Sequence, residues 1–499
     1  MDLSKIVKDR KLILDRLPLL ESGGQYAAQW HIGLKQELYN KEAEGIAALQ
    51  ISALKDDEAE GRPKTFAEMK ALREEGKFEE VKIGDEFGES WDCWWFYVQF
   101  EVKQSWIDAQ HEIHFFWDSD SEALLYTEEG KVMQGFLGED AELSERRRAY
   151  YILKREGFKD DLVLGKVNYY IQMSCMRFKG CWNDDRTNFH SGVNMHLTFK
   201  LKQCELKAFN REVWDMLWDY YIVKECASEL ETSQSSRAYD AMYTGEIISD
   251  KCKPNDSSTF PECRTLAKNF MDVENSASQH QIYAMGHCHI DLGWLWPFKE
   301  TPKKIGRSWS IQRELMNFYP SHRFCSSSSK IFEIVKEQYN ELYVDMKAKA
   351  LAEEPTFFPV GGSYIEFDCN LPNGESMCRQ FLLGQRFFAQ EFGTRRELFF
   401  MPDTFGYTGA LPQIMALSGI KYFVTTKLGW SIFNEFPHNT FYWKGIDGST
   451  ILAHYPPAHY SSTRGYVKEV LLSQTQFKDK GRSNSSMMFF GFGGNLFIN

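Results

Sequence analysis

The sequence lacks the features that mark several common protein classes. No stretch approaches the roughly 20 consecutive apolar residues that a membrane-spanning helix needs. The first residues mix charged and apolar side chains and lack the apolar core of a signal peptide. The eleven cysteines are scattered, with neither a paired framework nor a Cys-x-x-Cys clasp. We therefore expect a cytoplasmic protein with reduced thiols and no membrane partner.

Clusters of lysine and arginine are also absent, and the formal net charge is −12 at pH 7. This acidic balance argues against nucleic acid or an anionic membrane as the main partner. Apolar and aromatic residues are plentiful instead, at 43% and 15% of the chain. At 499 residues the chain exceeds one ordinary core, so we expect two or three domains that bury large apolar interiors.

Changes of pattern divide the chain into four parts. Residues 1–80 form a lead that favours helix as far as about residue 55, followed by a charged linker. Residues 81–200 hold short aromatic and β-branched runs broken by Gly and Asp, which is typical of a β-sandwich or jelly roll. Residues 201–265 form a helical connector. Its first amphipathic helix is marked by Leu206, Phe209, Val213, Leu217 and Tyr220. In residues 266–499 strands and helices alternate, which predicts a largely parallel sheet or barrel with helices outside.

A histidine-rich turn opens this last part. His287, His289 and Asp291 follow a predicted buried strand at 281–285 and precede a predicted helix at 303–318. Functional sites of α/β folds are built at this edge of the sheet. His289 and Asp291 are two residues apart in an extended segment, so both side chains can reach one metal ion. An imidazole nitrogen with a carboxylate oxygen suits zinc or cobalt.

Aromatic and acidic residues extend this pattern. Trp294 and Trp296 follow the turn, and aromatic faces beside a polar site suit a sugar ring. Asp403 follows a predicted strand at 398–401, and Glu366 and Asp368 follow another at 356–360. Two acids near one metal ion suggest hydrolysis of an acetal, in which one carboxylate attacks and a protonated second one donates to the leaving oxygen. Asp403 could instead cap the next helix, and Asp368 could hold a turn.

Three motifs resemble those of the class II α-mannosidases, the metal-dependent retaining enzymes of glycoside hydrolase family 38. They are Gly-His-Cys-His-Ile-Asp-Leu-Gly-Trp-Leu-Trp-Pro, Pro-Val-Gly-Gly-Ser-Tyr-Ile-Glu-Phe-Asp-Cys-Asn-Leu-Pro and Met-Pro-Asp-Thr-Phe-Gly-Tyr-Thr-Gly-Ala-Leu-Pro. The resemblance is best to the cytosolic type and runs from about residue 80 to residue 493. It implies an N-terminal β-sandwich-like module followed by a seven-stranded, barrel-like α/β catalytic domain.

The resemblance also implies the site. The implied ligands of zinc or cobalt are His289, Asp291 and Asp403. Asp403 is then also the nucleophile, Asp368 is the candidate general acid/base, and Trp294 and Phe405 line the sugar pocket. The implied reaction is retaining hydrolysis of terminal, non-reducing α-D-mannosides in free or N-glycan-derived oligosaccharides. An oligomannoside is thus the expected partner, and a homo-oligomer is compatible with the sequence.

The chains of this family are longer, so we expect a catalytic domain that is incomplete at its C-terminus. The family's last metal-binding histidine has no counterpart, and the proton-donating acid could belong to the same missing region instead of being Asp368. His454 and His459 are the candidate replacements for that histidine in this sequence. Two other functions stay open. One is an impaired form that binds glycan or a partner without turnover, and the other is a zinc-dependent carbohydrate deacetylase, since those enzymes also place His and Asp on barrel rims.

Overall fold

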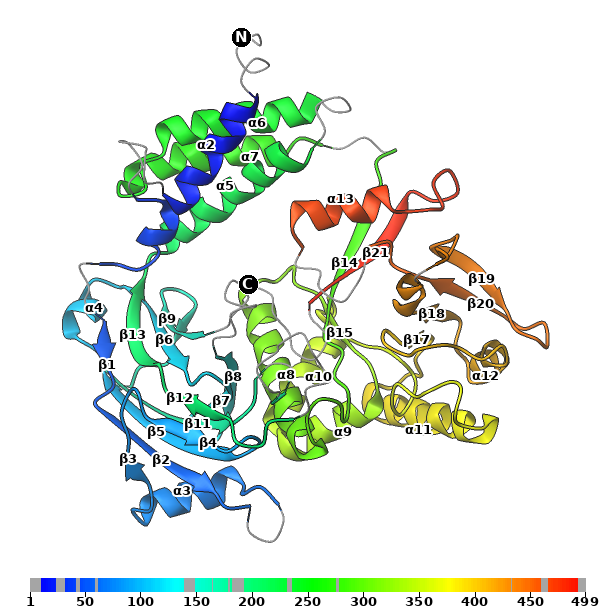
Figure 1. The fold of residues 1–499 in the computed structure, drawn as a ribbon, viewed down its shortest axis with the longest axis horizontal. Helices are drawn as coiled ribbons and strands as arrows, with labels where there is room; N and C mark the ends of the chain where they lie inside the picture. Colours follow the sequence, from blue (N-terminus) through cyan, green and yellow to red (C-terminus); the bar gives the residue numbers. More distant parts are fainter. Residues whose placement is uncertain are drawn as a thin grey trace.

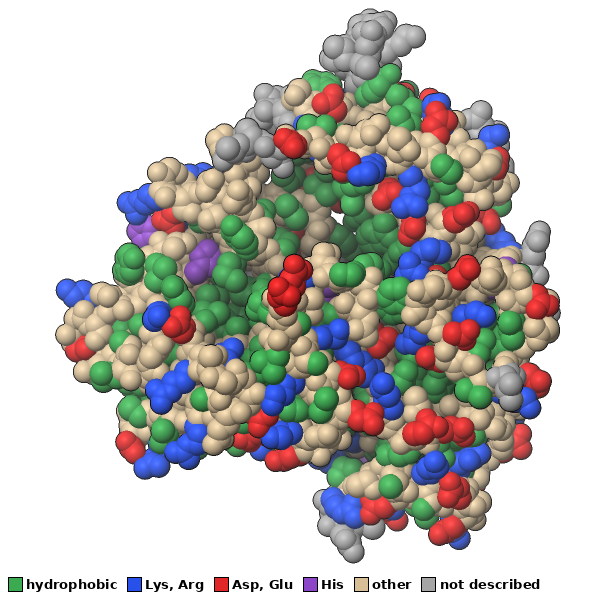
Figure 2. All heavy atoms as spheres, turned by 180° about the vertical axis from the view of Figure 1, so that it is seen from behind, with side chains coloured by type: hydrophobic (Ala, Val, Ile, Leu, Met, Phe, Trp, Pro, Cys, Tyr) green, Lys and Arg blue, Asp and Glu red, His purple; other side chains and the backbone are tan. Residues whose placement is uncertain are grey.

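The computed structural model describes residues 10–491 except 24–31, 42–44, 59–61, 139–148, 164, 178–179, 182–192, 231–235, 275–277, 432 and 459–464. Figure 1 shows a helical bundle at the top, a β module at the lower left and an α/β part at the right. Figure 2 shows the opposite face, on which lysine and arginine side chains are interspersed with acidic ones. Among the described residues, no helix is both long and apolar enough to cross a membrane.

The β module consists of two antiparallel sheets with a small third one. One sheet has the order β1-β13-β6-β9-β10, and its strands are β1 (Ile46–Ala47), β6 (Glu112–Asp118), β9 (Tyr150–Arg155), β10 (Lys159–Asp160) and β13 (Gln203–Phe209). The other has the order β3-β2-β5-β11-β7-β8, and its strands are β2 (Gln50–Asp56), β3 (Glu79–Glu80), β5 (Cys93–Glu101), β7 (Glu122–Tyr126), β8 (Val132–Leu137) and β11 (Lys166–Ser174). β4 (Glu86–Gly88) pairs with β12 (Thr198–Lys200), and two short helices, α3 (Phe66–Glu74) and α4 (Gln104–Asp108), complete the module.

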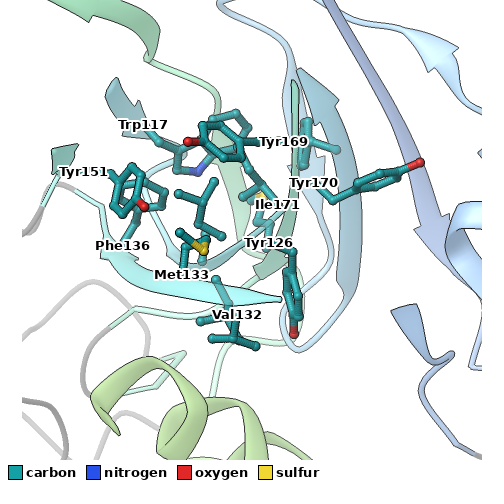
Figure 3. Packing of buried hydrophobic residues seen from close by; sticks show 14 of the residues in the cluster. Trp117, Tyr126, Val132, Met133, Phe136, Tyr151, Tyr169, Tyr170 and Ile171 are labelled. Atoms are coloured by element: carbon teal, nitrogen blue, oxygen red, sulfur yellow. The ribbon is translucent and has the colours of Figure 1, made fainter. Parts of the chain in front are cut away.

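Aromatic side chains fill the space between the two large sheets. Phe115 on β6 meets Phe100 on β5 at 5.3 Å between ring centroids, and Tyr151 on β9 meets Tyr169 on β11 at 6.0 Å. Figure 3 shows Tyr169 pointing into this core while its neighbour Tyr170 points to the other face of β11, as strand alternation requires. The predicted sandwich-like module is therefore confirmed, and these aromatics serve as its core.

Two predictions at the edges of this module are wrong. Residues 46–47 and 50–56 are strands and not helix, because β2 pairs along its whole length with β5 and buries Ile51 and Ala53 against the module. Leu206 and Phe209 belong to strand β13 and not to the following helix, which begins at Arg211. A pattern within one segment could not show either pairing, because both depend on strands distant in sequence.

The helical bundle combines a helix that precedes the β module in sequence with three helices that follow it. Its helices are α2 (Arg10–Ser22), α5 (Arg211–Glu229), α6 (Ser236–Lys251) and α7 (Phe260–Met271), with a 3-10 turn at Leu34–Glu37. Leu17 of α2 is buried against this set, and its backbone oxygen accepts a hydrogen bond from the Tyr220 hydroxyl at 2.9 Å. The predicted helical lead is thus observed for residues 10–22, and the domain boundaries between the parts stay predictions.

The α/β part follows the predicted alternation closely. Its strands are β14 (Gln281–His287), β15 (Phe324–Ser326), β16 (Phe357–Pro359), β17 (Leu398–Phe400), β18 (Tyr422–Val424), β19 (Thr440–Lys444), β20 (Thr450–His454) and β21 (Ser485–Phe490). Its helices are α8 (Thr301–Phe318), α9 (Ser329–Gln338), α10 (Asn340–Leu351), α11 (Gly374–Phe392), α12 (Leu411–Leu417) and α13 (Val467–Thr475), with 3-10 turns at Phe298–Glu300 and Lys427–Trp430. The prediction that residues 281–285 are buried is wrong, since Tyr283 is 62% exposed.

These strands form two four-stranded sheets, in the orders β16-β15-β14-β21 and β17-β18-β20-β19. All pairs are parallel except β19 with β20. Cys325, Phe400, Val424 and Phe489 form one buried cluster drawn from both sheets. A single backbone bond, from Gly361 N to Leu398 O at 3.0 Å, leads from the end of β16 to β17. Strand pairing is not continuous over the described residues, so a closed seven-stranded barrel is not confirmed.

Helix α8 fixes the α/β part against the β module. Fifteen of its 18 residues are buried, although many of them are charged. Glu122 on β7 accepts a hydrogen bond from Lys304 Nζ at 2.9 Å and pairs with Arg307 Nη2 at 2.5 Å. Arg313 donates to the backbone oxygens of Val132 and Met133 at 2.9 and 2.8 Å. Helix α8 begins ten residues after Asp291, and its first residue, Thr301, donates through its hydroxyl to the backbone oxygen of Leu292 at 2.7 Å, which ties α8 to the chain just beyond the histidine-rich turn.

Candidate active site

The turn after β14 separates its two histidines. His287 is buried, lies 3.0 Å through Nδ1 from the backbone oxygen of Cys325, and packs edge-on against Phe400. Burial lowers the pKa of His287 to about 3, with a smaller effect from nearby His289. His287 is therefore a neutral part of the core, whereas His289 reaches the rim.

His289 meets two carboxylates at the strand ends. Its Nε2 atom lies 3.2 Å from Asp291 Oδ1 and 3.9 Å from Asp403 Oδ2. One ligand atom from each of these three residues lies within 4.8 Å of the other two. The structure thus brings together the three residues that the sequence predicted as metal ligands, from the turn after β14 and the turn after β17. Their role as ligands stays a prediction.

Glu366 contacts both His289 and the backbone of Asp403. Its Oε2 atom lies 2.9 Å from His289 Nδ1, and its Oε1 atom accepts hydrogen bonds from Asp403 N at 2.5 Å and Thr404 Oγ1 at 3.1 Å. Burial lowers the pKa of His289, but the carboxylates of Glu366 and Asp291 outweigh it and raise that pKa well above its ordinary value. The sequence placed Glu366 at this rim but gave it no role. Its position after the Gly361-Gly362 turn was the available signal.

Lys427, like Glu366, is a residue of this site to which the sequence assigned no role. It begins the 3-10 turn after β18, and its Nζ atom lies 2.8 Å from Asp403 Oδ1. The side chain of Lys427 is 5% exposed, because its ammonium lies over the rings of Trp430 and Phe405, at 3.3 and 4.6 Å from their centroids. A lysine directly after a strand end was the signal in the sequence.

The predicted sugar-binding aromatics are accessible. Trp294 is 53% exposed, and it meets the buried Trp296 edge-on at 5.5 Å. Trp296 is instead structural, since its indole nitrogen donates to Thr301 Oγ1 at 3.2 Å. Phe405 is 77% exposed and lines a cavity of about 820 Å³, whereas His289, Asp291 and Glu366 line a smaller one of about 210 Å³. Trp294 lines neither of these two cavities.

Asp368 lies in different surroundings. It is exposed, and its Oδ1 atom accepts hydrogen bonds from the backbone nitrogens of Asn370 at 2.7 Å and Leu371 at 2.8 Å. These two donors lower the pKa of Asp368, whereas a proton donor needs a raised pKa. The contacts are those of a turn-holding aspartate and do not favour the predicted role as general acid/base.

His454, one of the two candidate substitutes for the last metal-binding histidine, does not join the cluster. His454 lies in β20, where Thr440 Oγ1 is 2.9 Å from its Nδ1 and Met487 N donates to its Nε2 at 3.3 Å. His454 therefore has its ring nitrogens engaged in holding β19, β20 and β21 together. His459 lies outside the described residues.

Comparison with known proteins supplies the context for this geometry. Residues 279–497 match the sequence profile "Glycosyl hydrolases family 38 N-terminal domain", and residues 48–207 match "Alpha-mannosidase, jelly roll domain". Human alpha-mannosidase 2C1 is 39% identical over 83% of this chain, and alpha-mannosidase G of Dictyostelium discoideum is 38% identical over 84%. The alpha-mannosidase of Saccharomyces cerevisiae is 32% identical over 84%. The matched regions cover 38%, 37% and 38% of these relatives, so the chain spans about two fifths of their length.

Proposed function

This chain belongs to glycosyl hydrolase family 38, and on that premise we propose that it carries the nucleophile and metal-binding side of a retaining α-mannosidase site. The observation that supports this most is the convergence of His289, Asp291 and Asp403 at one rim. In retaining glycosidases a carboxylate attacks the anomeric carbon and forms a covalent glycosyl–enzyme intermediate, which water then hydrolyses. We assign that attack to Asp403.

The donor set fits zinc or cobalt. His289 offers an imidazole nitrogen, and Asp291 and Asp403 offer carboxylate oxygens, the ligand types that these ions accept. Glu366 faces the other ring nitrogen of His289, the arrangement that usually fixes the tautomer of a metal-binding histidine. When bound, such an ion supplies a Lewis acid that can hold sugar hydroxyls beside the reacting carbon.

Lys427 and Glu366 position the nucleophile. The ammonium of Lys427 pairs with Oδ1 of Asp403, while the backbone nitrogen of Asp403 donates to Glu366. Side chain and backbone are therefore both restrained, so that little reorientation is needed before attack on the sugar. Asp368 does not suit the proton-donor role for the reason given above.

The proposed substrates are terminal, non-reducing α-D-mannosides of free or N-glycan-derived oligosaccharides. The printed names of the relatives, all alpha-mannosidases, support the sugar, and the exposed rings of Trp294 and Phe405 offer faces for it. A cytoplasmic location is proposed because all eleven cysteines are unpaired, as in a reducing compartment. The family and these relatives do not favour a carbohydrate deacetylase. The remaining alternative, a form that binds glycan without hydrolysing it, differs from the proposal in showing no turnover.

A mechanism-based fluorinated mannoside tests the assignment of Asp403. We expect the zinc-supplemented chain to gain the mass of one fluoromannosyl group on the peptide that contains Asp403. The Asp403→Asn variant should stay unlabelled, because an amide cannot form the glycosyl ester. The matched variant Asp368→Asn should still be labelled when the reagent is a fluoromannosyl fluoride, since its anomeric fluoride leaves without a proton donor while the ring fluorine stays on the label. Wild-type chain that remains unlabelled, or is labelled on another residue, contradicts the proposal.

A further inference from the structure

A large cavity adjoins Asp403 on the side of Lys427. It measures about 820 Å³, which is in the range of small-molecule sites in proteins. Its lining combines aromatic with polar side chains, namely Phe405, Tyr407, Trp430, Phe436, Ser431, Asn434 and Glu435. The cavity is distinct from the smaller one lined by His289 and Asp291. One mannose beside the metal ligands, against Phe405, would therefore leave the part of this space around Trp430 available.

The ammonium of Lys427 joins this cavity to the nucleophile. The same Nζ atom that lies 2.8 Å from Asp403 Oδ1 lies 3.3 Å from the ring centroid of Trp430. Lys427 lines the cavity itself, as does Phe405, two residues beyond Asp403. A group bound over Trp430 is thus adjacent to a sugar bound at Asp403 and can be covalently linked to it.

The chemistry of the lining indicates what binds there. Trp430 is 59% exposed although Lys427 covers part of its ring, and Phe405 is 77% exposed. Neighbouring exposed aromatic rings beside a polar site are a common sign of a binding surface. A pyranose has an apolar C–H face that can pack on an indole and hydroxyls that can bond to polar groups. The Ser431 hydroxyl, the Asn434 amide and the Glu435 carboxylate lie on the same lining.

We propose that Trp430 is the platform of a second sugar subsite, which binds the hexose linked to the mannose that Asp403 attacks. This inference rests on the proposed function and makes it more specific. The substrate is then at least a disaccharide in its recognised part, and the aglycone contributes to binding. A simple alkyl mannoside should leave the Trp430 platform empty and bind more weakly for that reason.

Binding measurements test the subsite independently of turnover. Isothermal titration of the zinc-supplemented full chain would compare a sulfur-linked α-mannobiose, which glycosidases do not hydrolyse, with methyl α-mannoside. We expect wild-type protein to prefer the disaccharide by roughly tenfold, the order of one aromatic stacking contact. Trp430→Ala should lose this preference and keep its affinity for methyl α-mannoside, and Trp430→Phe should retain part of the preference. The control Tyr442→Ala removes a ring that is 75% exposed on β19 and lies outside the cavity, so it should behave as wild type.

The other possible results of this titration overturn either the subsite or the proposed function. Equal affinity of wild-type protein for the two ligands overturns the subsite, and so does an unchanged preference in Trp430→Ala. Equal weakening of both ligands in Trp430→Ala also overturns it, because Trp430 would then act only by supporting Lys427. Failure of wild-type protein to bind either ligand overturns the proposed function itself, and the subsite with it.

Discussion

Glu366 and His289 meet through Oε2 and Nδ1 at 2.9 Å, on the side of the imidazole ring opposite the atom that faces Asp291 and Asp403. This contact orients the ring so that Nε2 faces the two other carboxylates. Glu366 uses its second oxygen for the backbone of Asp403, and one side chain therefore sets the positions of two of the three proposed ligands.

Glu366→Gln should weaken zinc binding. An amide offers one acceptor oxygen where the carboxylate uses two, so either the His289 contact or the Asp403 contact is lost. Loss of a partner behind a metal-binding histidine typically lowers affinity by about 10- to 100-fold. Competition with a zinc-chelating dye measures this. Glu375→Gln, on the exposed first turn of α11, is the control, and equal zinc affinity in both variants would contradict the role of Glu366.

Lys427→Met should slow labelling by the fluorinated mannoside. The substitution keeps most of the length of the side chain but removes the ammonium that pairs with Asp403 Oδ1, so the carboxylate can turn away from its attacking position. Misplacement of a reacting group by about 1 Å can reduce a rate by roughly 100-fold. Stopped incubations followed by mass spectrometry give the labelling rate. Lys421→Met removes an exposed lysine paired with Glu397 and should label at the wild-type rate, whereas an unchanged rate in Lys427→Met would refute the positioning role.

Glu122→Gln should destabilise the junction between the β module and α8. The substitution removes the negative charge that Lys304 and Arg307 share, while both cations remain buried. Breaking a buried ion pair from one side commonly costs about 3–5 kcal/mol. Urea unfolding would show a lower midpoint, with loss of α8 packing. Glu129→Gln, at an exposed turn between β7 and β8, is the control and should leave the midpoint unchanged. An unchanged midpoint in Glu122→Gln would contradict the prediction.

We expect the free energy of unfolding to decrease in mild acid because of the buried His454. Burial lowers the pKa of His454 to about 4, and Met487 N donates to Nε2, an atom that must therefore be unprotonated. Since the pKa of an unfolded histidine is about 6.5, the unfolded chain takes up this proton first. The contribution of His454 is thus full above pH 6.5 and is lost as the pH falls from 6.5 toward 4.

Comparison with His454→Gln isolates this effect, because glutamine does not titrate. Denaturation midpoints measured between pH 7 and pH 4 should fall more steeply in wild-type protein than in the variant. Parallel curves for the two proteins would show that His454 does not titrate as its burial requires.

Local patterns were enough to predict most of the α/β part. Strands β16 and β17 fall within the predicted ranges 356–360 and 398–401, and α8 ends at the predicted residue 318. Helix α11 ends before Gly393, whose φ of 75° suits the left-handed end of a helix. Polar residues at strand ends were correctly expected to meet at one rim. These features depend on periodicity and capping within short segments, which a sequence carries directly.

The remaining features were decided by contacts between distant segments. Strand β2 exists because β5 pairs with it, and a local pattern could not distinguish that strand from a helix. Glu366 and Asp368 are two residues apart and both carry a carboxylate, yet one supports His289 and Asp403 while the other holds an exposed turn. Only the tertiary structure separates them, because the use of a carboxylate depends on which donors the fold places around it.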